Sequence, residues 1–143
     1  MRTIAVPITL INLNDDGFHV LVEIVVFDTN CWAVIDTGAS RSVFDKGFIQ
    51  RNLEEVITVE DSNTTTLFTT SSTVQALIPK LKIGKLTIKN YHAVALDLES
   101  VNEAYALMGH PRIDAILGSD IFYEYQAKIN YKRLKIIFSR PRK

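Results

Sequence analysis

The chain of 143 residues lacks several features that would define a class of protein. It has one cysteine, Cys31, which excludes the internal disulfides of small secreted scaffolds and makes a buried structural thiol the expected role. No apolar run approaches the ~20 residues of a membrane-spanning helix. Met1 leads directly into a strand-like pattern and not into the apolar core of a signal peptide. If the sequence is complete, we expect a cytoplasmic protein that does not enter a membrane.

The chain also has no excess of charge of either sign. Its 16 basic and 16 acidic residues give a formal net charge of zero, so no overall field favours nucleic acid or an anionic membrane as a partner. The three histidines, His19, His92 and His110, stand far apart in the sequence, with no cysteine or carboxylate at metal-ligand spacing. We therefore expect neither a metal nor an organic cofactor.

Val, Ile, Thr and aromatic residues between turn signals predict a mostly β structure. The clearest signal is Asp16-Gly17, which lies between two apolar runs and is typical of a hairpin. The expected strands cover residues 3–13, 18–27, 31–35, 74–83, 86–88, 92–98, 113–117, 126–131 and 134–138. Short helices are expected over 45–53, with Asp45 near the N-terminus, around 103–107, and over 121–125. A single domain, residues 1–143, suits this length.

The segment that is most informative about chemistry is Asp36-Thr37-Gly38-Ala39-Ser40, which follows an apolar strand. A carboxylate at such a strand end is held in one orientation when hydroxyl and backbone N–H groups donate to it. Thr37 supplies a hydroxyl, and Gly38 allows another backbone to approach closely. The alternative is that Asp36 only ends a strand and forms a turn. Further along, a second apolar strand ends in Ile116-Leu117-Gly118 and leads into a short helix.

This pair of motifs resembles the signature of the retropepsin-like aspartic proteases, over roughly residues 18–138. The resemblance implies an all-β acid-protease barrel with short helices, one lobe per chain. It implies that Asp36 is the catalytic carboxylate, that Thr37 locks two halves together beneath the paired carboxylates, and that Gly38 presents its backbone to the substrate. Ala39 and Ser40 would then lie beside the cleft.

The second motif of the resemblance is structural. Ile116-Leu117-Gly118 would close a loop around the first strand, with Gly118 packed under the active loop and a helix behind Asp36. Ser119 or Asp120 would cap that helix. For Asp114 and Asp120, capping and turn formation are the favoured roles.

The implied chemistry needs two carboxylates that share one proton, one to deprotonate a water and the other to protonate the oxyanion. The chain contains one Asp-Thr-Gly, whereas two-lobed pepsin-like enzymes carry two. The resemblance therefore implies a C2 homodimer with the two Asp36 side chains at its axis. Such a dimer would be an aspartic endopeptidase acting on peptide or protein substrates.

Family members cover the cleft with a β-hairpin flap, which by position falls within residues 61–76. That segment is rich in threonine and has no glycine; a hairpin and disorder are the two alternatives for it. Leu67 and Phe68 are apolar residues of the segment that can reach a substrate. The absence of glycine keeps a second interpretation open, a catalytically silent dimeric binding or scaffold module. A third is an enzyme whose cleft opens only in a larger assembly.

Overall fold

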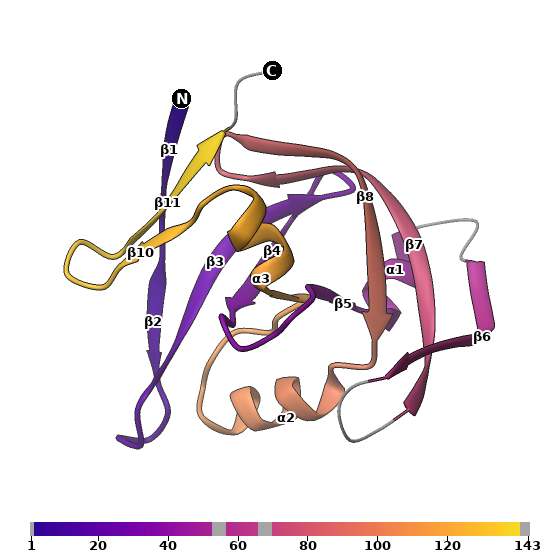
Figure 1. Ribbon diagram of the computed structural model, residues 1–143. Coiled ribbons are helices and arrows are strands. Elements are labelled where there is room, and N and C mark those ends of the chain that lie inside the picture. Colours follow the sequence, from indigo (N-terminus) through magenta and orange to yellow (C-terminus); the bar gives the residue numbers. More distant parts are fainter. Residues whose placement is uncertain (1, 53–56, 66–69, 141–143) are drawn as a thin grey trace.

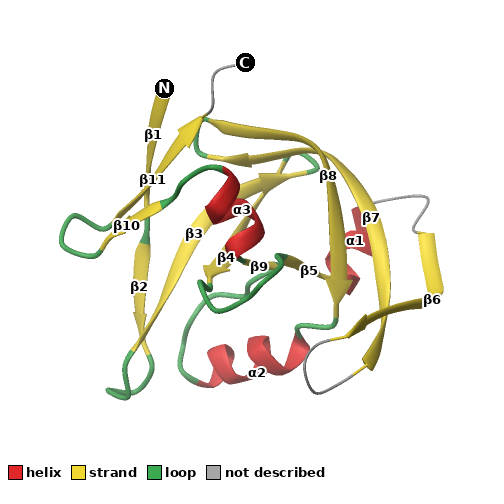
Figure 2. Cartoon of the chain, viewed as in Figure 1, coloured by secondary structure: helices red, strands yellow, loops and turns green. Residues whose placement is uncertain are grey.

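The computed structural model describes residues 2–52, 57–65 and 70–140. Most of these residues are in strands, with short helices between them (Figure 2). The strands are β1 (Arg2–Pro7), β2 (Thr9–Asn12), β3 (Phe18–Val26), β4 (Thr29–Ile35), β5 (Val43–Asp45), β6 (Ile57–Thr65), β7 (Thr70–Ile83), β8 (Leu86–Leu96), β9 (Ala115–Leu117), β10 (Lys128–Asn130) and β11 (Lys135–Arg140). The helices are α1 (Lys46–Asn52), α2 (Glu99–Leu107) and α3 (Ser119–Glu124). The all-β prediction with short helices is confirmed.

The larger sheet has the strand order β2-β3-β4-β9-β5-β8-β7-β6. Because β3 also pairs with β7, the six strands from β3 to β7 in this order close into a barrel. A smaller sheet, β1-β11-β10, lies at the left of Figure 1, and β6 lies at the right. Register Arg2↔Arg140 brings the two ends of the described chain together. Among the residues described, no helix is long and apolar enough to cross a membrane.

The N-terminal run divides between the two sheets, where the sequence predicted one strand over 3–13. β1 ends at Pro7, which has no N–H to donate. The next residue, Ile8, donates its N–H to the carbonyl of Leu134 at 3.0 Å, and β2 then pairs with β3 in the barrel. The hairpin predicted at Asp16-Gly17 is present, since β2 and β3 pair antiparallel from Asn12↔Phe18 outward.

Three further elements differ from the prediction. The short strand β5 was missed, because three residues carry too little pattern to be recognised. Helix α2 begins at Glu99, earlier than the turn expected around 103–107. The strand β8 runs without a break from Leu86 to Leu96, whereas two strands were predicted there. At the expected break Asn90 has a positive φ of 54°, so the strand bends but its pairing continues.

The core consists of two clusters of buried side chains. The larger fills the barrel and includes Phe44, Ile78 and Phe138, each fully buried. The smaller, which includes Val34, Tyr105 and Ile113, packs beside helix α2. Burial of each large aliphatic or aromatic side chain stabilises the fold by roughly 1.5–3 kcal/mol, so these two clusters supply much of the stability of the barrel and its loops.

Candidate active site

The two sequence motifs meet in the barrel. β4 and β9 pair in parallel with the register Ile35↔Leu117, so Asp36 and Gly118 follow the ends of neighbouring strands. The backbone N–H of Asp36 donates to the carbonyl of Leu117 at 2.9 Å. Residues that are far apart in the sequence are thus joined directly at the end of β4.

The segment of residues 36–42, here called the active loop, orients the Asp36 carboxylate. Oδ1 of Asp36 accepts a hydrogen bond from the backbone N–H of Gly38 at 2.9 Å. The N–H of Ala39 donates to the carbonyl of Asp36 at 3.1 Å. Residues 33–35 are buried, but Asp36, Thr37 and Gly38 are exposed in the single chain. The carboxylate is therefore held by its own backbone while it faces outward.

Gly118 lies under the active loop with no space for a side chain. A Cβ atom there would be 2.6 Å from the carbonyl oxygen of Ala39 and 3.0 Å from the carbonyl carbon of Arg41. The next residue, Ser119, holds the same loop: its N–H donates to the carbonyl of Ala39 at 2.8 Å and its hydroxyl to that of Ser40 at 3.3 Å. The second motif therefore supports the backbone that carries Asp36.

The prediction that Ser119 or Asp120 caps helix α3 is wrong. Gly118 occupies the N-cap position, and no side chain caps the helix. Oδ1 of Asp120 instead accepts hydrogen bonds from the N–H of Ser42 at 2.9 Å and from its hydroxyl at 2.7 Å. Oδ2 of Asp120 accepts from the hydroxyl of Tyr91 at 2.5 Å. Asp120 does not cap the helix because donors from two other segments of the chain, at Ser42 and Tyr91, face its carboxylate.

Ser42 and Tyr91 were not recognised from the sequence as site residues. Ser42 is fully buried, and its hydroxyl oxygen also accepts from the N–H of Gly118 at 2.8 Å. Burial raises the pKa of Tyr91 far above its ordinary value, and the hydrogen bond to Asp120 raises it further. The phenol therefore stays protonated and donates its hydrogen bond to Asp120. No local pattern marked these residues, because Ser42 directly follows two other polar residues, Ser40 and Arg41.

The hairpin predicted within residues 61–76 is present. β6 and β7 pair antiparallel, from Ile57↔Gln75 to Thr65↔Thr70, with a register shift between Val59 and Asn63. Leu67 and Phe68, the predicted substrate contacts, lie outside the described residues.

Asp114 belongs to an ionic cluster and not to a cap or turn. The Arg112 guanidinium lies 3.3 Å from Asp45, 3.3 Å from Glu99 and 3.6 Å from Oδ1 of Asp114. Burial raises the pKa of Asp114, and the nearby charge of Asp45 adds to this, while Arg112 opposes it. Asp45 is buried and, as expected, lies at the start of α1, where it accepts from the N–H of Phe48 at 3.2 Å.

Cys31 is free and buried, as predicted. Burial is the main cause that raises the pKa of its thiol to about 12, and Asp114 and Glu23 add to the effect. Across residues 2–52, 57–65 and 70–140, no group of His, Cys, Asp and Glu is arranged to hold a metal ion.

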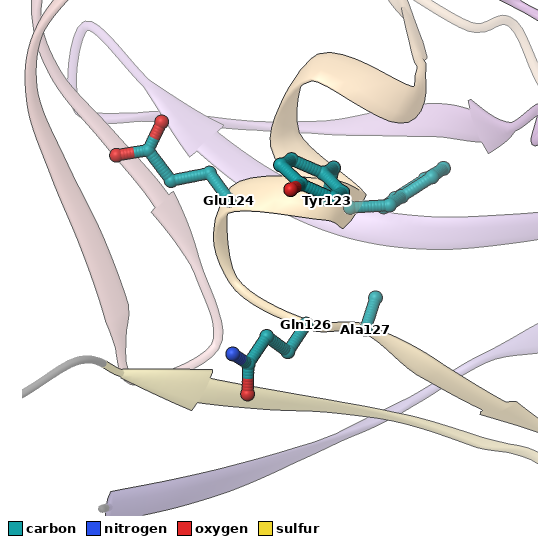
Figure 3. A pocket seen from close by; sticks show the side chains of 5 residues that line it. Tyr123, Glu124, Gln126 and Ala127 are labelled. Atoms are coloured by element: carbon teal, nitrogen blue, oxygen red, sulfur yellow. The ribbon is translucent and has the colours of Figure 1, made fainter.

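A pocket of about 630 Å³ opens at the end of α3 and is lined by Phe122, Tyr123, Glu124, Gln126 and Ala127 (Figure 3). None of these residues belongs to the active loop. Within the active loop itself, Ser42 is buried and Ala39 is half-buried, and the other residues are exposed in the single chain.

Comparisons with known proteins agree with this geometry. A sequence model of the family described as aspartyl protease matches residues 22–121. No curated protein sequence matches the chain. A retropepsin-like aspartic protease from Rickettsia conorii superposes with a TM-score of 0.57 at 16% identity, covering 96% of this chain and 90% of that one.

Two further solved structures are similar. The retroviral protease-like domain of Ddi1 from Leishmania major gives a TM-score of 0.52 at 15% identity, with 78% and 81% of the two chains covered. The EIAV protease, complexed with the inhibitor HBY-793, gives 0.54 at 20% identity, with 77% and 90% covered. The likeness confirms the predicted retropepsin-like barrel as the fold.

Proposed function

The chain belongs to the aspartyl protease family, and from this premise we propose that it is an aspartic endopeptidase. The observation that carries the proposal is the orientation and exposure of the Asp36 side chain. Its carboxylate is oriented by the N–H of Gly38 and follows a buried strand, yet it is exposed in the single chain. A fixed, outward-facing carboxylate is the half-site that a second identical subunit would complete.

The proposed reaction uses the two Asp36 side chains of a C2 homodimer. Two carboxylates at close range cannot both be ionised, so the pair shares one proton; the dyad of aspartic proteases is the established example of this coupling. The ionised member takes a proton from water, which attacks the peptide carbonyl carbon, and the protonated member donates to the carbonyl oxygen. The C–N bond then breaks as the member that took the proton from water gives it to the amine nitrogen, and the other member takes a proton back from a hydroxyl of the diol intermediate.

A homodimer is part of the proposal because the chain has one Asp-Thr-Gly and the mechanism needs two. Exposure of Thr37 and Gly38 supports it, since side chains and backbone at a dimer axis are uncovered when one subunit is considered alone. We assign to Thr37 the contact that locks the two active loops together.

The proposed substrate is an extended peptide or an unfolded segment of a protein. It would lie over Gly38, Ala39 and Ser40 and beneath the β6–β7 hairpin, with Leu67 and Phe68 as apolar contacts. Support comes from the antiparallel pairing of β6 with β7 at the place where relatives of this fold class carry a flap.

The test is cleavage of a peptide library by the purified protein and by Asp36→Asn. We expect activity at acid to near-neutral pH that Asp36→Asn abolishes. Asp28→Asn is the matched control, because it changes an exposed Asp in the β3–β4 turn, away from the active loop. Full activity in Asp36→Asn, or a rate that does not vary with pH, would rule out this mechanism.

A second candidate function is a dimeric binding or scaffold module that keeps the fold and cleaves nothing. The absence of glycine from residues 61–76 favours it, because a flap tip without glycine has less conformational freedom. A peptide with a hydroxyl transition-state mimic separates the two. It should bind far more tightly than its plain analogue only if the carboxylate pair is ready for catalysis.

A further inference from the structure

The ribbon formed by β7 and β8 changes its inward face halfway along. In a strand, residues that face the core recur at intervals of two. In β7 the buried residues are Val74, Ala76 and Ile78, and then Leu81 and Ile83. In β8 they are Leu86 and Ile88, and then Ala93, Val94 and Ala95. Both series shift by one residue, between Ile78 and Leu81 and between Ile88 and Ala93.

The shift occurs where Pro79 lies opposite Asn90. Ile78↔Tyr91 and Lys80↔Lys89 are paired on either side of these two residues. Pro79 has no N–H to donate, and Asn90 adopts a positive φ of 54°, a conformation that Asn tolerates better than most residues. Without the shift, Tyr91 would point outward. The bend in the ribbon turns it toward the interior.

Tyr91 then reaches the network behind the active loop. Its ring lies 6.1 Å from that of Phe44, and its hydroxyl donates to Oδ2 of Asp120 at 2.5 Å. Oδ1 of Asp120 holds both donors of Ser42. All three donors point at one carboxylate, which has only acceptors to offer, so each of the three hydrogen bonds is charge-assisted.

The network continues to the strand end that carries Asp36. The Ser42 hydroxyl accepts from the N–H of Gly118 at 2.8 Å, and the preceding residue, Leu117, accepts from the N–H of Asp36 at 2.9 Å. The neighbour of Tyr91 makes a second connection, because the guanidinium of Arg41 donates to the carbonyl of His92 at 2.9 Å. Two successive residues of β8 are thus joined to the active loop or to its support.

We propose that Asp120 is a positioning residue for Asp36, and that Tyr91 couples the active loop to the β7–β8 ribbon. This inference rests on the proposed peptidase function. Because β7 pairs with both β8 and β6, the ribbon is continuous with the β6–β7 hairpin. Through its hydroxyl, Tyr91 thus connects the support of the active loop to strands that extend into that hairpin.

The test compares Tyr91→Phe with Tyr105→Phe. Each removes one buried or half-buried hydroxyl, and the Tyr105 hydroxyl makes a similarly short hydrogen bond, 2.6 Å to Nδ1 of His19. We expect Tyr91→Phe to lower kcat roughly tenfold with KM nearly unchanged, as for loss of one charge-assisted hydrogen bond. Tyr105→Phe should leave kcat unchanged at 25 °C. A wild-type kcat in Tyr91→Phe would overturn the coupling.

Two substitutions of Asp120 test its role. Asp120→Asn keeps an oxygen for Ser42 and places an amide toward Tyr91, so it should lose much less kcat than Asp120→Ala. Equal losses in the two variants would mean that the hydrogen bonds of this side chain do not position Asp36. If Asp120→Ala does not fold, Tyr91→Phe decides the outcome.

Hydrogen exchange separates this inference from the peptidase proposal. Tyr91→Phe should accelerate exchange at the amides of Ser42 and Gly118, whereas Tyr105→Phe should not. If the wild-type protein cleaves no peptide, the peptidase proposal fails and exchange alone judges the coupling. Unchanged exchange at both amides in Tyr91→Phe would reject it whatever the activity.

Discussion

The tight packing under the active loop gives a sharp prediction for Gly118→Ala. The backbone at Gly118 has φ −122° and ψ −171°, which any residue adopts, so the substitution causes no backbone strain. Its whole effect comes from the added Cβ, which would lie 2.6 Å from the carbonyl oxygen of Ala39. Ordinary contact begins at 3.4 Å, so the loop must withdraw by about 0.8 Å.

The magnitude follows from what resists that movement. The N–H of Ser119 and the hydroxyl of Ser42 hold the loop through bonds of 2.8 Å, and a shift of this size breaks or lengthens them. Overpacking costs about 1–3 kcal/mol and each weakened hydrogen bond about 1 kcal/mol. We expect a loss of about 3 kcal/mol, or a fall in Tm of roughly 6–12 °C for a chain of this size.

The assay is thermal unfolding together with peptide cleavage, with Gly47→Ala as the control. Gly47 lies within α1, where a Cβ would meet the flexible end of Arg51 at 3.2 Å, so alanine should leave Tm unchanged or raise it slightly. Gly118→Ala should also lose activity, because the loop that moves carries Asp36. A Gly118→Ala variant with wild-type Tm and activity would refute the argument from close packing.

Two other predictions concern buried titratable groups. The pKa of Asp114 is raised in the folded protein, mainly by burial, so ionisation of this carboxyl costs stability as the pH rises above its ordinary value of 3.8. Asp114→Asn should therefore raise the urea midpoint at pH 7 and lose this advantage below pH 3.8; a lower midpoint at pH 7 would contradict the assignment. The buried thiol of Cys31, whose pKa is raised to about 12, should react with a disulfide reagent at pH 8 only after unfolding. Rapid reaction of the native protein would show that Cys31 is accessible.

The exposure of Asp36 gives the dimer proposal its physical content. The Asp36 carboxylate is oriented by the N–H of Gly38 and is exposed in the single chain. In the proposed mechanism, the second carboxylate comes from another subunit that covers this site. Analytical ultracentrifugation across a range of concentrations therefore tests the same idea as the cleavage assay. A protein that stays monomeric while it cleaves peptides would require a different source for the second carboxylate.

Several features of this protein follow from local sequence alone. Asp16-Gly17 predicts the first hairpin because the turn needs residues that accept unusual backbone angles at that point. The apolar runs that end at Ile35 and Leu117 predict buried strands, and Asp36-Thr37-Gly38 with Ile116-Leu117-Gly118 indicates the family. These signals are readable because each depends on neighbours within a few residues.

The hydrogen-bond network of Ser42, Tyr91 and Asp120 behind the active loop is visible only in the tertiary structure. The partners Ser42 and Asp120 are 78 residues apart, and Tyr91 and Asp120 are 29 apart, so no local pattern reports that they meet. Tyr91 points inward because the inward face of β8 shifts at Asn90, where β8 is paired with β7 on either side. Strand periodicity is a local property, whereas the choice of hydrogen-bond partner depends on how the barrel closes.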